Sequence, residues 1–154
     1  MAILQPMSSF DVLIDSSAFI ARMAEGDPFL EDARRGFQML KTQQLRVAVT
    51  NLIIGETLTV LSHRGGQALA RQFMGHIERS EMPIIFVNED LHQTTVQLFC
   101  QQAKKGTSFV DCANVVVVRH LGISKIFSFD EFHRRAGVQT FVTRQAPVQN
   151  SHET

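Results

Sequence analysis

The sequence has no tryptophan or tyrosine, only two cysteines, and no excess of either charge. Cys100 and Cys112 lack the spacing of a disulfide framework or a zinc site, so we expect both to be small buried hydrophobic residues. No apolar run approaches the roughly 20 residues that span a bilayer. The opening "MAILQPMSSF" lacks the basic and apolar regions of a signal peptide. These absences predict a cytoplasmic protein that does not associate with membranes.

The charges balance, with fifteen lysines and arginines against fifteen aspartates and glutamates. A zero net charge is not typical of a strongly basic nucleic-acid-binding protein. However, if four of the acids gather in one metal site, the remaining eleven face fifteen basic residues, a surplus of four positive charges. A neutral total is therefore compatible with a basic rim around an acidic site.

Short apolar runs alternate with amphipathic stretches along the 154 residues, a length typical of one domain. Strands are predicted at residues 10–14, 45–49, 83–87, 125–129 and 138–142. Helices are predicted at residues 17–24, 28–42, 52–63, 66–79, 88–103 and 109–121. This alternation indicates an α/β domain with a parallel sheet covered on both faces. We assign residues 1–143 to the domain and residues 144–154 to a polar C-terminal tail.

Two predicted strands lead directly into a carboxylate: Asp15 follows "FDVLI" and Asp130 follows "KIFSF". In open parallel sheets, functional sites lie at the carboxyl ends of the strands, where the strand order reverses. Each aspartate is also a good cap for a following helix. Both interpretations stay open at the level of sequence.

Glu56 falls inside the apolar face of the predicted helix 52–63. A carboxylate in such a place costs several kcal/mol unless it is paired or binds a metal. The neighbouring Gly55 sacrifices about 1 kcal/mol of helix propensity, which predicts that another segment packs closely there. The alternative is a buried ion pair, for which Arg119 is one partner.

Asp111 lies three residues after Ser108, a spacing that resembles a capping box at the start of helix 109–121. Such a cap would fix the acid on the first helical turn. Asn114 is three residues further on and shares its face. We expect it to be either a weaker ligand or a supporting hydrogen-bond donor.

With four acids in this order along the predicted strands and helices, the sequence resembles the PIN-domain nucleases. It is similar in particular to the small single-domain VapC-like toxins of bacterial type II toxin–antitoxin modules. The matching segments are "VLIDSSAFIA", "TNLIIGETLTVL", "SFVDCANVVVVRHLGISKIFSFD" and "FHRRAGV", which together cover about residues 10–142. The resemblance implies a three-layer α/β/α sandwich with a five-stranded parallel sheet of order 3-2-1-4-5. In one departure, Phe132 precedes His133 here, whereas many relatives place the phenylalanine one residue later.

The resemblance also implies a reaction. Clustered carboxylates are ligands suited to Mg²⁺ or Mn²⁺, and Asp15, Asp111 and Asp130 are the candidate metal ligands. Glu56, the fourth candidate catalytic acid, would orient or deprotonate a water that attacks single-stranded or loop RNA. Candidate supporting residues are Ser16, Ser108 and Asn114, and candidate RNA phosphate contacts are Arg22, Lys104, Lys105, Arg134 and Arg135.

The implied partners are a second copy of the chain and a cognate antitoxin. The apolar content of residues 27–79 also favours a homodimer, because it exceeds what one buried face requires. One alternative is a catalytically silent protein- or RNA-binding module of the same fold. Another is a Mg²⁺-dependent phosphohydrolase, but that chemistry usually needs Asp-x-Asp after the first strand, where this chain has Asp15, Ser16 and Ser17.

Overall fold

The computed structural model describes residues 8–141, so the predicted tail lies outside the described residues. A four-stranded sheet has the order β3-β2-β1-β4, and all its strand pairs are parallel. The strands are β1 (Val12–Ile14), β2 (Val47–Thr50), β3 (Ile84–Ile85) and β4 (Lys125–Phe127). The α/β class and the predicted order of these four strands are therefore confirmed.

The predicted fifth strand needs correction within the described residues. It is reduced there to one parallel bridge between Ile126 and Thr140. Two backbone hydrogen bonds make this bridge, from Ile126 N to Gln139 O at 2.9 Å and from Phe141 N to Ile126 O at 2.8 Å. The segment leaves a short helix only a few residues earlier, so little chain is available for pairing.

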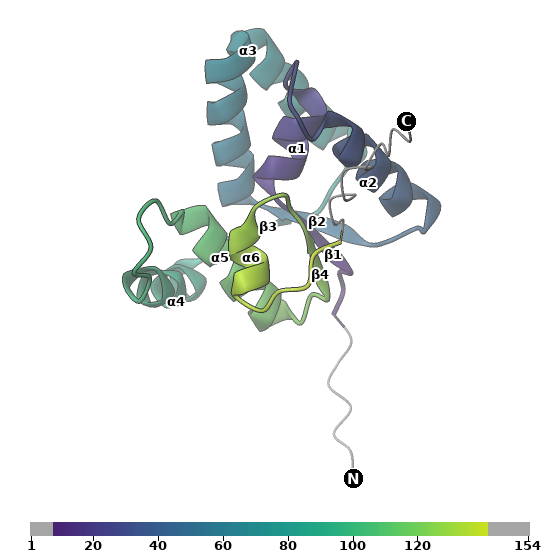
Figure 1. Cartoon of the computed structure of the whole chain (residues 1–154). Helices are drawn as coiled ribbons and strands as arrows, with labels where there is room; N and C mark the ends of the chain where they lie inside the picture. Colours follow the sequence, from purple (N-terminus) through teal and green to yellow (C-terminus); the bar gives the residue numbers. More distant parts are fainter. Residues whose placement is uncertain (1–7, 142–154) are drawn as a thin grey trace, which may run out of the picture.

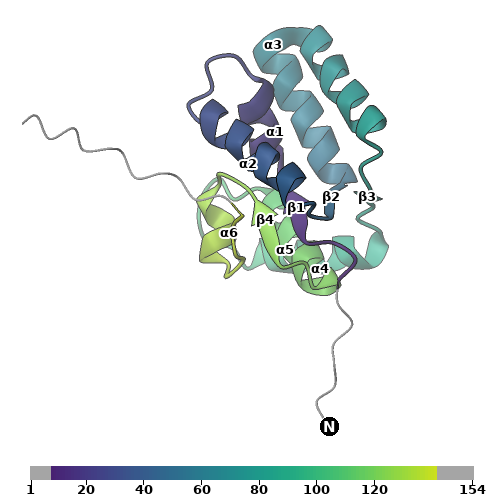
Figure 2. The ribbon, with the colours of Figure 1, turned by 90° about the vertical axis from the view of Figure 1, so that its right-hand side faces the viewer.

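Helices cover both faces of the sheet, as Figures 1 and 2 show. One layer contains α1 (Ser16–Met23), α2 (Leu30–Thr42) and α3 (Asn51–Ser80). The other contains α4 (Glu89–Cys100), α5 (Phe109–Leu121) and α6 (Glu131–Arg135). The predicted three-layer sandwich is thus confirmed. None of the described helices has the length and apolar character needed to cross a membrane.

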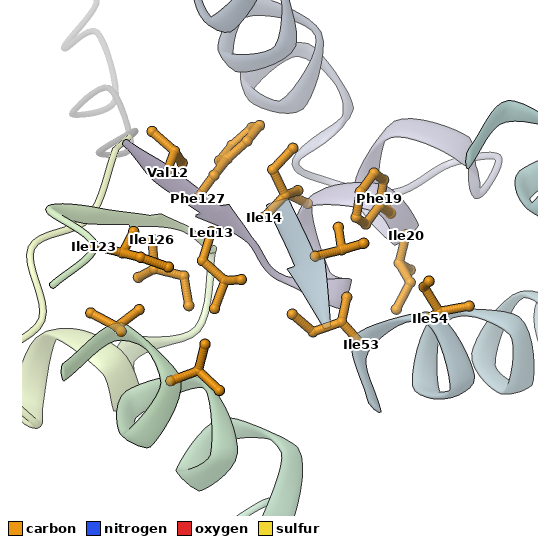
Figure 3. Close-up of a cluster of buried hydrophobic side chains, with 14 of the residues drawn as sticks. Val12, Leu13, Ile14, Phe19, Ile20, Ile53, Ile54, Ile123, Ile126 and Phe127 are labelled. Atoms are coloured by element: carbon orange, nitrogen blue, oxygen red, sulfur yellow. The ribbon is translucent and has the colours of Figure 1, made fainter. Parts of the chain in front are cut away.

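The core forms where the two layers meet the central strands. All three residues of β1 are buried, as expected for a strand that is covered on both faces. In Figure 3, Leu13 points to the opposite side of β1 from Val12 and Ile14. Phe127 and Ile126 of the neighbouring β4 are also fully buried. Each such side chain contributes roughly 1.5–3 kcal/mol through burial, so the central strands are rigid supports.

The helices predicted at 52–63 and 66–79 form one element, α3, which is interrupted at Gly66. Thr50 caps its start, because the Thr50 side chain accepts a hydrogen bond from Ile53 N at 3.0 Å. Gly66 has φ 83° and ψ 171°, a conformation that is almost restricted to glycine. The chain reverses direction at this break (Figure 2).

Two local expectations are wrong. Cys100 is exposed, whereas Cys112 is buried as predicted. Cys100 is the last residue of α4, where the helix end is open to solvent. At Gly55, a Cβ atom would meet nothing within 4 Å, so no segment packs closely there.

These two glycines give a matched test of backbone conformation. Gly66→Ala should lower the free energy of unfolding by about 1–3 kcal/mol, because alanine is strained at the observed φ and ψ. Gly55→Ala should raise it by about 0.5–1 kcal/mol, because Gly55 lies in open space inside a helix. Urea unfolding with unchanged m-values would measure both shifts. Equal effects of the two substitutions would contradict the assigned break in α3.

Candidate active site at the carboxyl ends of the strands

Asp15 follows β1 and is the most enclosed acid of the site, with 1% of its surface exposed. Its Oδ2 accepts hydrogen bonds from Ser17 Oγ at 2.7 Å and Ser128 Oγ at 2.8 Å. Its Oδ1 accepts one from Asn114 Nδ2 at 2.9 Å. Asp15 also caps α1 through Ser17 N. Capping and a place in the site are therefore compatible for this residue.

The register between β1 and β4 explains why these donors meet Asp15. Ile14 pairs with Phe127, and Asp15 N donates a hydrogen bond to Phe127 O at 3.0 Å. The next residue of that segment is Ser128, so its hydroxyl group is delivered beside the carboxylate. Parallel pairing thus builds the site from residues more than 100 positions apart.

Glu56 lies on the first half of α3 and is half-buried. It accepts a hydrogen bond from Ser16 Oγ at 2.5 Å, and the same hydroxyl group lies 3.4 Å from Asp15 Oδ1. Arg119 instead donates to Ala136 O, and Glu56 forms no ion pair within residues 8–141. The alternative of a buried Glu56–Arg119 pair is therefore wrong. Burial raises the pKa of Glu56, the Ser16 hydrogen bond opposes this rise, and the charges of Asp15 and Asp130 add to it.

Asp111 lies on the first turn of α5, where its backbone N–H donates to Ser108 Oγ at 3.3 Å. The expected Ser108 cap is thus present. Burial, together with the charges of Asp15, Asp130 and Glu56, raises the pKa of Asp111 to about 8. All four predicted acids therefore interact electrostatically.

His133 completes the enclosed part of the site. Its Nε2 lies 3.5 Å from Asp111 Oδ1 and 3.4 Å from Asn114 Nδ2. One ligand atom each of Asp15, Asp111 and His133 lies within 4.8 Å of the others. This group contains two of the three predicted metal ligands, with an imidazole as its third member.

Asp130, the remaining predicted metal ligand, is exposed at the rim. Its side chain caps α6 by accepting a hydrogen bond from Phe132 N at 2.8 Å. It is not a member of the group within 4.8 Å, although its charge raises the pKa of Asp111 and of Glu56. As with Asp15, the cap and a place near the site coexist.

Among the five predicted phosphate contacts, Lys104 and Arg135 line one cavity and Arg22 lines another. Arg22 lines a groove of about 470 Å³ with apolar residues of α1, α2 and α3. Lys104 and Arg135 line a separate cavity of about 220 Å³. Arg134 is paired with Glu131, and Lys105 is exposed.

Three residues of the site were not selected from the sequence: Ser17, Ser128 and His133. Ser128 carried a usable signal, because it is the single hydroxyl group in the buried run "KIFSF". Ser17 lies two residues after a capping aspartate, a position from which a hydroxyl group can reach back. His133 had no periodic signal, because the five-residue α6 is too short to show one.

Comparisons with known proteins identify the family and the fold of the chain. A family model described as the PIN domain matches residues 12–138. The chain is 25% identical over 126 residues to the "23S rRNA-specific endonuclease VapC20" of two strains of Mycobacterium tuberculosis, covering 82% of this chain and 94% of the relative.

Solved structures share the fold. The crystal structure of Mycobacterium tuberculosis VapC20, described as a "Sarcin-Ricin loop cleaving toxin", matches with a TM-score of 0.76 at 24% identity. That match covers 86% of this chain and 99% of the VapC20 chain. A toxin–antitoxin complex from Klebsiella pneumoniae matches with a TM-score of 0.51 at 15% identity, covering 78% and 87% of the two chains.

The raised pKa of Asp111 predicts how the metal-free protein responds to pH. Because the pKa is higher in the folded state, about 8 against an ordinary 3.8, folding favours the protonated acid. The resulting contribution of Asp111 to the stability of the fold is fully present below the ordinary pKa and is lost as pH rises through about 8. In a chelator, the melting temperature of Asp111→Asn should therefore fall less with rising pH than that of the wild type.

Melting curves between acidic and mildly alkaline pH would measure this difference. At the alkaline end, the melting temperature of the variant should exceed that of the wild type, because the neutral amide does not repel the other acids. Glu25→Gln is a suitable control, since Glu25 is exposed and its removal should leave the wild-type profile unchanged. Parallel profiles for the wild type and Asp111→Asn would contradict the prediction.

Proposed function

The chain belongs to the PIN-domain family, since the family model matches residues 12–138, and we propose that it is a metal-dependent endoribonuclease that cleaves single-stranded or loop RNA. The observation that carries this proposal is the gathering of Asp15, Glu56, Asp111 and Asp130 near the carboxyl ends of the central strands, close enough for their charges to act on Asp111. A silent binding module has no need for four mutually repelling carboxylates. We therefore prefer the enzyme to that alternative.

The residues present fit a divalent cation. Asp15 and Asp111 offer carboxylate oxygens in one enclosed group. Burial raises the pKa of Asp111, and repulsion by Asp15 adds to this rise. A cation would relieve that repulsion and favour the ionised acid. When bound, Mg²⁺ or Mn²⁺ would supply a Lewis acid for the scissile phosphate. Asp130 would contribute from the rim, directly or through water.

Glu56 is suited to accept a proton from the attacking water. Its pKa is raised by burial and by the neighbouring acids, which brings it closer to the range in which a general base is efficient. The Ser16 hydroxyl group, which donates to Glu56 at 2.5 Å, would hold the carboxylate in place. Ser16 and Asn114 thus support the two acids that they contact, and Ser108 supports Asp111 through the helix cap.

The substrate class rests on the relatives. VapC20 carries the name of a 23S rRNA-specific endonuclease and the description of a sarcin–ricin-loop-cleaving toxin. A structured loop of RNA, whose backbone can bend into the site, is therefore the first substrate to test. Lys104 and Arg135, which line one cavity, are the predicted cations best placed to bind flanking phosphates together.

We further propose that the chain acts as the toxin of a toxin–antitoxin module. The apolar groove between α1, α2 and α3 is lined by Phe19, Phe37 and Phe73, with Arg22 at its edge. These features suit an amphipathic helix of an antitoxin that presents an acidic residue to Arg22. The Klebsiella pneumoniae toxin–antitoxin complex, which has a similar fold, supports an antitoxin partner in general.

We propose that the chain forms a homodimer through a surface that lies outside residues 27–79, the region that the sequence favoured. The exposed large hydrophobic residues of the described chain are Ile84, Phe86, Val96 and Phe99. They lie on or next to β3 and on α4, outside residues 27–79. Phe86 is 67% exposed beside the edge strand, a position that natural proteins usually cover.

Activity is the direct test of the proposed function. Asp15→Asn, Asp111→Asn and Asp130→Asn should each lose nearly all cleavage of a labelled RNA that contains the sarcin–ricin loop. Glu56→Gln should lose about 10²–10⁴-fold in rate, the range for a general base. Wild type in excess chelator should be inactive until Mg²⁺ or Mn²⁺ is restored. Glu25→Gln is the matched control and should retain full activity.

Undiminished cleavage by any of the three aspartate variants would remove that residue from the mechanism. Equal cleavage with and without chelator would reject the metal-dependent reaction itself. Gel analysis of end-labelled products, with circular dichroism to confirm folding, would separate loss of chemistry from loss of structure.

The dimer has a separate test. Wild type should sediment as a dimer at tens of micromolar, and Phe86→Glu should sediment as a monomer, because a charge on the proposed apolar contact opposes its desolvation. Glu25→Gln should remain dimeric. A wild type that is monomeric under these conditions would contradict the proposal.

A further inference from the structure

His133 is a buried polar residue in the site that is not one of the four acids of the family. It lies on α6 with 0% of its surface exposed. Buried polar atoms are normally hydrogen-bonded, but His133 Nδ1 has no hydrogen-bond partner within residues 8–141. An apolar ring would fill such a position at lower cost, because it has no polar group to desolvate. The imidazole therefore has a role beyond packing.

The surroundings of Nε2 indicate what that role is. Asn114 Nδ2 donates to Asp15 Oδ1 at 2.9 Å, and the same amide nitrogen lies 3.4 Å from His133 Nε2. A ring nitrogen that accepts from an amide carries a lone pair and not a proton. This lone pair faces Asp111 Oδ1 at 3.5 Å. Two acceptor atoms at this separation repel each other unless a proton or a metal cation lies between them. In the metal-free protein the proton of Asp111 can fill this place, and a divalent ion would displace it.

A further acceptor belongs to the same cluster. Asn114 Oδ1 is buried and has no hydrogen-bond partner in the described part of the chain. Asp15, Asp111 and His133 each offer a ligand atom within 4.8 Å of the other two. Two atoms that bind the same ion, each at about 2.1 Å, are at most about 4.2 Å apart. The three atoms here lie within 4.8 Å of one another, so they need to approach only slightly to bind one cation together.

We propose that His133 binds the divalent ion directly through Nε2 and thereby makes the site selective for a transition ion such as Mn²⁺ over Mg²⁺. This inference rests on the proposed metal-dependent function and adds a nitrogen ligand to it. Asp130, exposed at the rim, then completes the oxygen ligands or acts through water.

The chemistry of the ligand set gives the direction of the selectivity. Mg²⁺ demands oxygen ligands and keeps several of its waters. Imidazole nitrogen suits first-row transition ions, of which Mn²⁺ is the weakest binder and the one that also suits oxygen ligands. Mn²⁺ therefore shares the preference for nitrogen in part, whereas Mg²⁺ is bound through oxygen. Because both ions have the same charge, the acids attract them similarly. A difference in affinity between them therefore reports on the nitrogen ligand.

Pulsed electron paramagnetic resonance of Mn²⁺ bound to the metal-free full chain tests the bond itself. Wild type should show the ¹⁴N coupling of a directly bound imidazole, and growth with ¹⁵N-histidine should change that signal to the ¹⁵N pattern. His133→Phe, which keeps a flat ring of similar size, should bind Mn²⁺ without the coupling. His63→Phe is the matched control, because His63 is exposed, and it should keep the signal.

Calorimetric titration of the same proteins tests the selectivity. His133→Phe should weaken Mn²⁺ binding by at least about 10–100-fold, the range for loss of a residue that only orients a metal ligand, and should change Mg²⁺ binding much less. His133→Asn provides a second variant if the phenylalanine disturbs folding. The ¹⁵N-labelled wild type needs no substitution at all.

The outcomes separate this inference from the proposed function. Mn²⁺ that binds and supports RNA cleavage without nitrogen coupling would overturn the ligand role of His133 and leave the nuclease intact. Equal loss of Mn²⁺ and Mg²⁺ affinity in His133→Phe would also overturn it, since a merely structural role predicts that result. Failure of the wild type to bind either ion would overturn both proposals.

Discussion

The burial of the Asp15 carboxylate is the constraint on which the rest of the site depends. A buried charge that loses its partners costs roughly 3–5 kcal/mol, so its donors must all be in place. Ser17 comes from α1, Asn114 from α5 and Ser128 from the segment after β4. Ser128 reaches the carboxylate only if β4 pairs with β1 in the observed register. The hydrogen bonds of one side chain thus tie both helical layers to the central strands.

The same arrangement creates an opposing force. The charges of Asp15, Asp130 and Glu56 raise the pKa of Asp111, whose burial already disfavours ionisation. The fold therefore brings together acids that repel one another, and rigid strands and helix caps hold them against that repulsion. A cation would convert this local cost into binding free energy. Stability without metal and affinity for metal are then two consequences of one electrostatic arrangement.

Much of this could be predicted from the sequence, because its signals are local or periodic. The buried strands are nearly continuous apolar runs, and their alternation with helices specifies the parallel sheet. Acids that directly follow such strands lie at the carboxyl ends of the strands, which predicts the positions of Asp15 and Asp130. The caps by Ser108 and the break at Gly66 also have local causes. Exposure of Cys100 and the loss of most of the fifth strand depend on the tertiary surroundings, which no short window of sequence contains.

His133 shows most clearly where sequence reasoning ends. Successive residues on a helix point about 100° apart, so a shift of one position decides which ring of α6 enters the site. Here His133 is fully buried and Phe132 is half-buried. The orientation of α6 is fixed from outside it, by Arg119 bound to Ala136 O and by Val138 N bound to His133 O. The bridge between Ile126 and Thr140 then attaches the following segment to the sheet. This single bridge therefore has a structural role, because it holds the segment that follows α6. The position of α6 in turn places the His133 imidazole beside the acids and Asp130 at the rim.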